Sequence, residues 1–246
     1  MWQKFMSLLG LKLAVRYSLP SCRLGFCGPR DQVSQKALYD FASGKKISEV
    51  KVRKILEKFE AMYPYLKLIA SSNQISDPFD EQVVKAFWVG NKLLDRVKRE
   101  DLQRMITSDF VKPGLLSREE AEKRAAQIPE EVVPHHSFHV FFLGSVTGRV
   151  DLAGAMKDLC RVSWGKVTEV KSEKLKVKSK PLVLGEKMRL GKEIEKEVGV
   201  GLPSVALAKE GDWVSFHWGQ VCDRLDKEDI LNLEYYTKRT ISALSR

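Results

Sequence analysis

Apolar residues recur at helical spacing through the first half of the chain. The segment Ile47–Phe59, for example, carries apolar side chains three and four positions apart, the pattern of one face of an α-helix. Pro64 and the segment Asp77–Asp80 are typical helix starts, and Ser117–Glu120 has the spacing of a capping box. The pattern predicts helices over about 5–17, 31–42, 48–62, 80–97 and 117–127, another helix from Pro64 and a short helix from Asp101.

The pattern changes after Pro129 and again at Pro134. Residues 138–143 are rich in aromatic and β-branched side chains, which predicts a strand. Short strands are then expected over 162–170, 174–179, 181–184 and 188–190, with residues 205–207 before a turn and a last strand over 213–218. Asp226 is suited to cap a helix that runs to about Leu244. We therefore expect an α+β fold, with an all-helical domain over 1–150 and a small β-barrel with a C-terminal helix over 151–246.

The net charge of +10 raises the question of an acidic partner such as nucleic acid. The densest lysine run, Lys171–Lys180, alternates with apolar residues as a solvated strand face does, and no RNA-binding aromatic motif accompanies it. Nucleic acid is therefore not favoured. No apolar run approaches the roughly 18 residues of a membrane span, and Lys12 and Arg16 interrupt the apolar core that a signal peptide needs. We expect a cytoplasmic protein with reduced cysteines.

Cys160 and His217 are the first candidates for chemistry, because a thiolate and an imidazole together can hold a transition metal. Arg161 follows Cys160 directly, and a neighbouring cation favours the thiolate. His217 shares the less apolar face of the last strand with Trp213 and Ser215. A buried cysteine that only fills space and a histidine that only bonds to backbone remain alternatives.

A second candidate site contains His135, His136 and His139, together with Cys27. On a helix, His135 and His139 would be four residues apart as in zinc proteases, but the glutamate base of the H-E-x-x-H pattern is missing. A metal-dependent hydrolase built on these three histidines would need a carboxylate that the sequence does not place. The alternative is a polar strand edge whose imidazoles bond to backbone.

Two motifs in the last third resemble the HypC/HupF family of nickel–iron hydrogenase maturation chaperones. Cys160 is followed by Gly-Lys-Val-Thr-Glu-Val at 165–170, and Gly211–Gly219 reads Gly-Asp-Trp-Val-Ser-Phe-His-Trp-Gly before an acidic-capped helix. The resemblance implies an OB-like barrel in which Cys160 and His217 hold an iron centre that passes between a scaffold partner and the hydrogenase. The chain departs from that family because Cys160 is internal, Trp164 replaces a proline, and a helical front is added.

The whole chain is also similar to an uncharacterised prokaryotic family of unknown function, through Arg16-Tyr17, Leu24–Pro29 and Pro134–His139. We expect an accessory or maturation protein, rather than an enzyme, that binds or delivers a metal centre, with iron as the implied metal. Its partner would be a metalloenzyme or an assembly factor, docked through Trp164, Trp213 and Trp218. The alternatives are a metal-free protein–protein adaptor and the histidine-based hydrolase.

Overall fold

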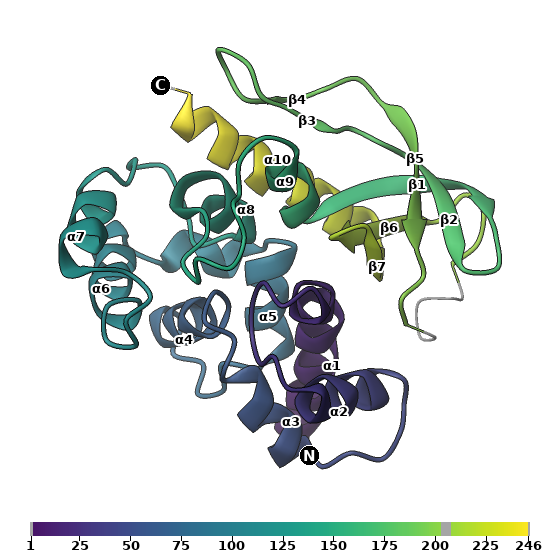
Figure 1. Ribbon diagram of the computed structural model, residues 1–246, viewed down its shortest axis with the longest axis horizontal. Coiled ribbons are helices and arrows are strands. Elements are labelled where there is room, and N and C mark those ends of the chain that lie inside the picture. The colour runs from purple at the N-terminus through teal and green to yellow at the C-terminus, as the bar shows by residue number, and fades with distance from the viewer. Residues whose placement is uncertain (1, 203–207, 246) are drawn as a thin grey trace.

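The computed structural model describes residues 2–202 and 208–245, so the segment 205–207 lies outside the described residues. Helices come first and strands follow, as expected (Figure 1). The helical elements are α1 (Trp2–Arg23), α2 (Gln32–Ala42), α3 (Glu49–Leu56), α4 (Tyr63–Ser72), α5 (Glu81–Trp88), the 3-10 helix η1 (Lys92–Arg96), α6 (Arg99–Asp109), α7 (Arg118–Ala126), α8 (His136–Phe138), the π-helical η2 (His139–Leu143), α9 (Ala155–Cys160) and α10 (Lys227–Leu244).

Helix α1 packs between the other N-terminal helices and the sheet. It packs against α2, α3 and α5 on one side and against the strands β6 (Trp213–His217) and β7 (Gln220–Leu225) on the other. Leu11, Ala14 and Tyr17 are completely buried. The sequence predicted a shorter peripheral helix over 5–17, and this was wrong because Pro20, which usually ends a helix, is accommodated inside it.

Predicted helix starts are confirmed where a side chain caps the helix. Asp31, Asp80, Ser117 and Asp226 each accept a hydrogen bond from a backbone N–H in the first turn of α2, α5, α7 and α10. The predicted long helix over 80–97 is broken at Gly90, whose φ of +100° is left-handed and suits glycine. A Cβ at Gly90 would also overlap the ring of Tyr236 from α10.

The remaining strands are β1 (Ser163–Val170), β2 (Lys174–Ser179), β3 (Leu182–Val183), β4 (Arg189–Leu190) and β5 (Ile194–Gly199). Five strands pair in the order β1-β2-β5-β7-β6, and β6 pairs back with β1. β5 and β7 meet through one parallel pair, Gly199 with Gln220, so the barrel is open along the rest of that seam. A five-stranded, partly open barrel is the form of OB-like folds, so the predicted α+β fold class is confirmed.

The predicted strand over 138–143 is wrong, because the segment forms α8 and η2 instead. Phe138, Val140 and Leu143 are all buried, and a short segment that is apolar on every side has no periodicity to separate a helix from a strand. Gly144, with a φ of +70°, ends the π-helical turn. The sequence pattern also missed β5 and β7, which complete the sheet.

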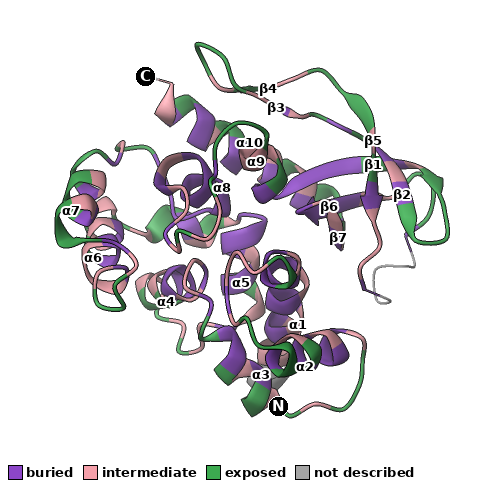
Figure 2. Cartoon of the chain, viewed as in Figure 1, coloured by how far each residue is buried: buried purple, intermediate pink, exposed green. Residues whose placement is uncertain are grey.

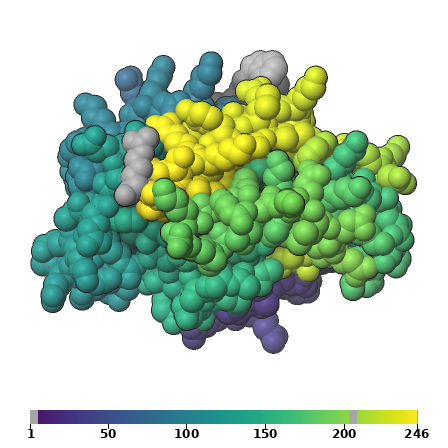
Figure 3. Space-filling model, turned by 90° about the horizontal axis from the view of Figure 1, so that it is seen from above, coloured from purple at the N-terminus to yellow at the C-terminus, as the bar shows by residue number. Residues whose placement is uncertain are grey.

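One buried cluster contains side chains from both the helices and the sheet, including residues of α1, α5, β1 and β6, which are largely coloured as buried in Figure 2. Helix α10 (yellow in Figure 3) packs against α8, η2 and the short strand β4. The predicted domain boundary near residue 150 stays a prediction. Within the described part of the chain, no helix is both long and apolar enough to cross a membrane.

The packing of α1 predicts that Gly10→Ala destabilises the protein. A Cβ at Gly10 would overlap the carbonyl oxygen of Phe79, and backbone cannot move aside as a flexible side chain can. We expect the free energy of unfolding, measured by urea denaturation, to fall by about 1–3 kcal/mol. Gly185→Ala, where an added Cβ meets nothing within 4 Å, should leave it nearly unchanged. Equal effects of the two substitutions would contradict this packing.

Candidate metal centre

Three candidate ligands from different elements meet inside the molecule. His136 begins α8, Cys160 ends α9 and His217 ends β6. One ligand atom of each residue lies within 4.8 Å of the other two, and all three residues are buried. Imidazole nitrogen and thiolate sulfur bind zinc at about 2.0–2.3 Å, so ligand atoms on one ion stand at most roughly 4 Å apart. Small side-chain rotations would therefore bring all three to a single ion.

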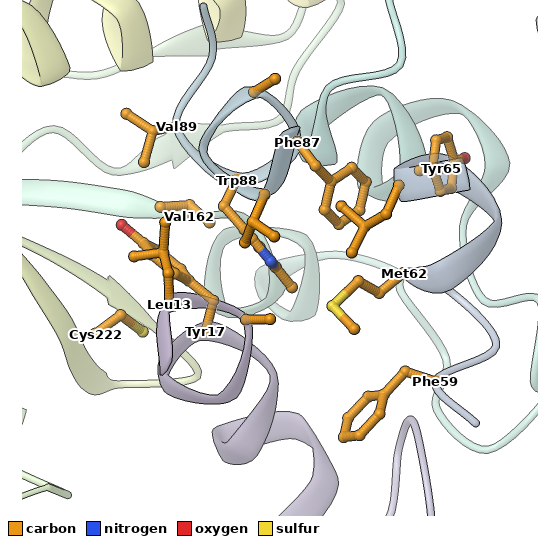
Figure 4. Packing of buried hydrophobic residues seen from close by; sticks show 14 of the residues in the cluster. Leu13, Tyr17, Phe59, Met62, Tyr65, Phe87, Trp88, Val89, Val162 and Cys222 are labelled. Carbon is orange, nitrogen blue, oxygen red and sulfur yellow. The ribbon is translucent and has the colours of Figure 1, made fainter. Parts of the chain in front are cut away.

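The three residues line a cavity of about 50 Å³ between the helices and the sheet. Its walls also include Ser18 of α1, Trp88 of α5 and Met62 before α4. Figure 4 shows Trp88 between Tyr17 and Phe87, with its indole ring extending toward the side of Met62. A single water needs on the order of 10–15 Å³ of such space. The cavity can therefore hold an ion and a few further atoms.

His217 is held in the tautomer that a metal ligand requires. Its Nδ1 lies 2.7 Å from the carbonyl oxygen of Tyr17 in α1. A carbonyl can only accept a hydrogen bond, so Nδ1 carries the proton and Nε2 keeps a free lone pair. Nε2 is buried without a hydrogen-bond partner. Metal-ligating histidines commonly donate their other N–H to a backbone carbonyl in this way.

His136 lies directly beside His217. The two rings are 5.1 Å apart between centroids in an edge-to-face arrangement, and Trp88 packs against His136 at 4.5 Å. The Nδ1 of His136 is buried and has no hydrogen-bond partner. Burial, followed by the neighbouring histidines, keeps the pKa of His136 well below its usual value. The ring is therefore neutral and offers a lone pair.

Cys160 is a protonated thiol in this environment. Burial, and then the nearby Cys27, raises the pKa of the Cys160 thiol. The expectation that Arg161 favours the thiolate is wrong, because its guanidinium bonds to Asp158 at 2.8 Å and to the carbonyl of Lys180 at 2.6 Å. A metal that binds Cys160 must therefore displace the proton of the thiol, which makes binding dependent on pH.

The rings of the other two histidines of the predicted second site have different surroundings. His139 lines the cavity, but its Nδ1 is 3.2 Å from the hydroxyl of Tyr65. His135 stacks on Tyr236 with 5.9 Å between centroids, and its Nδ1 accepts a hydrogen bond from the N–H of Ser137 at 3.3 Å. Of the described residues that line the cavity, none is His135.

Cys27 lines the same cavity from the loop after α1. Its sulfur lies 3.8 Å from a carboxylate oxygen of Glu60. Burial and then this carboxylate raise the pKa of Cys27 to about 12, so it too is a thiol. The predicted second set is thus divided: His136, His139 and Cys27 face the cavity, and His135 does not.

The three tryptophans predicted to contact a partner differ in exposure. Trp164 is buried beneath the guanidinium of Arg161, 5.7 Å from its ring. Trp218 is buried in the cavity wall, 4.7 Å from the ring of Phe26. Trp213 alone among the three is half-buried and reaches solvent. The surface that the three residues could offer a partner is therefore limited to Trp213.

Trp218 occupies an unusual backbone conformation. Trp218 and Gly219 form the two-residue turn between β6 and β7, with φ of +52° and +69°. Such a type I′ turn usually has asparagine and glycine, and a bulky residue in the left-handed region costs about 1–2 kcal/mol. The backbone N–H of Trp218 donates to the carbonyl of Leu159 at 2.8 Å, which ties the turn to α9 beside Cys160. Strain of this kind is concentrated at functional sites.

Two loops meet over the cavity and are fastened to each other. The hydroxyl of Thr147 donates to the carbonyl of Phe26 at 2.8 Å, and Arg149 donates to the carbonyl of Gly28 at 2.9 Å. Arg149 also forms an ion pair with Glu60. Phe26 and Thr147 are only partly buried, so these loops lie between the cavity and solvent.

The arrangement suits a transition metal rather than calcium or magnesium, because two imidazoles and one thiolate are nitrogen and sulfur ligands. Three protein ligands leave a further coordination position open toward the cavity. Among the described residues that line the cavity, none is aspartate or glutamate. The carboxylate of Glu60 contacts Cys27 of the wall from outside it.

Sequence reasoning paired Cys160 with His217 but did not add His136. Residue spacing could not find this partner, because His136 lies on a short helix that the pattern misread as a strand. The role of Trp218 could have been found, since a Trp-Gly pair between two apolar runs is compatible with a two-residue hairpin. That reading would also have revealed β7.

A protein-family model described as "Family of unknown function (DUF6390)" matches residues 6–246. The match covers nearly the whole chain, so the chain belongs to this family. The resemblance to a family of unknown function is thereby confirmed, whereas the match gives no support to a relation with the HypC/HupF family. Searches among curated proteins and among solved structures found no match.

The buried histidines predict a loss of stability in mild acid. Burial lowers the pKa of His135 to about 3 and those of His139 and His217 to about 4. These values lie below that of an unfolded histidine, near 6.5. As pH falls below that value the unfolded chain binds protons first, so the free energy of unfolding decreases down to the folded-state pKa.

We expect each buried histidine of the metal-free protein to contribute a slope of up to about 1.4 kcal/mol per pH unit below pH 6.5. Urea denaturation at pH 7 and pH 5.5 measures this slope. The glutamine of His135→Gln can still accept a hydrogen bond from the N–H of Ser137 but does not titrate. The free energy of unfolding of this variant should therefore change less with pH, by about the contribution of one histidine. An unchanged slope would show that His135 is not protonated on unfolding.

The loop contacts predict that Arg149→Ala opens the cavity. The substitution removes an ion pair and a hydrogen bond to backbone, which together restrain the two loops. We expect Cys160 to be alkylated about tenfold faster, as measured by mass spectrometry of the Cys160 peptide. Arg118→Ala removes an exposed ion pair with Glu122 and should leave this rate unchanged. Equal rates in both variants would mean that access follows another route.

Proposed function

We propose that this member of the DUF6390 family binds a transition metal ion through His136, Cys160 and His217, as an accessory protein that holds or delivers the metal. One observation carries the proposal. Two neutral imidazoles with unpartnered ring nitrogens and one thiol converge within 4.8 Å in a buried cavity. Leaving buried polar atoms unpaired costs about 1–3 kcal/mol each, and coordination would satisfy them.

The open position in the coordination sphere supports a role in holding a metal for transfer. A closed structural site uses four protein ligands, whereas this cavity offers three together with space beside them. The thiol must lose its proton on binding, so protonation of Cys160 would promote release. The loop fastening at Arg149 is suited to controlling when the metal leaves.

The proposed metal is iron, and the proposed partner is a metalloenzyme or its assembly factor. The motifs at Cys160 and Gly211–Gly219 that resemble the HypC/HupF chaperones support iron as the metal, and a metalloenzyme or its assembly factor as the protein partner. His136 would be a third ligand beside the cysteine and histidine of that family. We assign this function to the cytoplasm, where the four free cysteines would stay reduced.

A metal-free protein–protein adaptor is the second candidate. The observation in its favour is that Cys160 is buried and protonated, as expected for a cysteine that only fills space. A metal ligand in its empty state has the same properties. Metal content, rather than thiol reactivity, therefore distinguishes the two functions.

The proposal predicts that protein purified without oxygen contains about one equivalent of transition metal by elemental analysis. Cys160→Ser and His217→Gln should each lower metal affinity by about tenfold or more, because each removes one of three ligands. Reloading with Fe²⁺ or Co²⁺ after chelation measures the same loss as a change in Kd.

Two variants serve as matched controls. Cys222→Ser changes a buried cysteine of β7, and His135→Gln changes a buried histidine; neither residue lines the cavity. Both should keep the metal content of the unaltered protein, and circular dichroism checks that every variant is folded. If the unaltered protein stays metal-free after loading with Fe²⁺, Co²⁺ or Zn²⁺, the adaptor function is favoured instead.

A further inference from the structure

The outer face of α10 carries an exposed stripe of side chains. Glu228, Leu231, Tyr235, Lys238 and Ser242 are all exposed and recur at alternating intervals of three and four residues. That spacing places them in one line along a helix, as in the seam of a coiled coil. Figure 3 shows part of α10 (yellow) at the surface of the molecule. The stripe is therefore available to another helix.

The middle of the stripe is apolar. Leu231 is 66% exposed, and Tyr235, one turn later, is 56% exposed. The ring of Tyr235 packs edge-on against the buried Tyr236 at 4.9 Å between centroids, so less of its freedom is lost when a partner binds. Single exposed apolar residues are common on protein surfaces, but two neighbours on a coiled-coil seam form a patch that a second helix can cover.

The two ends of the stripe carry opposite charges. Glu228 lies three residues before Leu231, and Lys238 lies three residues after Tyr235. Lys238 pairs with Glu234 at 2.6 Å, but Glu234 also lies 3.8 Å from Lys180. Two lysines therefore share this one carboxylate, and the Lys238 end of the stripe keeps an excess of positive charge.

The stripe is complementary to itself when two copies run antiparallel. A two-fold axis between Leu231 and Tyr235 places Leu231 of one copy opposite Tyr235 of the other. The same axis places Glu228 opposite Lys238, because each lies three residues outside the central pair. In a parallel pair, each charge would face the same charge on the other copy, which is unfavourable. A symmetric contact of this kind uses the same patch on both molecules.

We propose that this face of α10 binds the same face of a second copy of the chain, antiparallel, in a symmetric dimer. A second copy is the partner that fits, because both the apolar centre and the two charged ends match themselves. The stripe is about 21 Å long, so the interface is small and the association is weak and reversible. The stripe residues do not line the cavity, so the dimer is independent of metal binding.

Sedimentation equilibrium of the full chain tests the dimer, at concentrations from about 5 to 500 µM that bracket a weak contact. The weight-average mass should rise from 28.0 kDa towards twice that value. Leu231→Ala should weaken self-association about tenfold or more, because a symmetric dimer loses both leucine side chains from its interface. Val33→Ala is the matched control, because Val33 of α2 is 70% exposed and lies outside the stripe, and it should associate as the unaltered protein does.

Exchange of the two charges tests the antiparallel arrangement. Glu228→Lys and Lys238→Glu each place like charges opposite one another twice in the dimer, so each variant alone should associate about tenfold more weakly. A mixture of the two variants restores both contacts between opposite charges and should dimerise as the unaltered protein does. Circular dichroism checks that every variant is folded.

Three results would overturn the dimer. The first is a mass that stays at 28.0 kDa at the highest concentration, which leaves the stripe to a different partner. The second is equal association of Leu231→Ala and Val33→Ala. The third is a mixture of Glu228→Lys and Lys238→Glu that associates no better than either variant alone.

Discussion

The hydrogen bond from His217 to the carbonyl of Tyr17 is the contact on which the site depends. It joins the last antiparallel pair of the sheet to α1, and both residues are buried, so water does not compete for either group. Because the carbonyl fixes the proton on Nδ1, the same contact decides which ring nitrogen faces the cavity. A second hydrogen bond, between the hydroxyls of Tyr17 and Ser215 at 2.7 Å, also joins β6 to α1.

The cavity therefore lies between the helical part and the barrel, and the barrel alone does not form it. Cys160 and His217 come from the C-terminal segment, whereas His136, Trp88 and the supporting carbonyl come from the helical part. A free barrel would leave the ring of His217 without its acceptor and its cysteine exposed. The helical front therefore supplies both His136 and the exclusion of water, so the buried group of His136, Cys160 and His217 depends on both parts of the chain.

The sequence predicted the parts of the fold that depend on local rules. Capping by Asp31, Asp80, Ser117 and Asp226 marked helix starts correctly, because these bonds form within one turn. It failed where tertiary packing overrides local preference, as at Pro20 inside α1 and in the buried segment after His135. The pairing of Cys160 with His217 could be predicted from the positions of both residues in the barrel. The proximity of His136 could not, because it depends on how the helices pack against the sheet.

The distance along the chain between Tyr17 and His217 has a consequence for when the site can exist. The two residues are 200 positions apart, and the hydrogen bond between them belongs to the core. Contacts of such long sequence separation form late and slowly, because the loop must close before the contact stabilises it. During synthesis, α1 emerges from the ribosome long before the strand that it supports. The cavity that brings His136, Cys160 and His217 together is therefore complete only in the finished polypeptide.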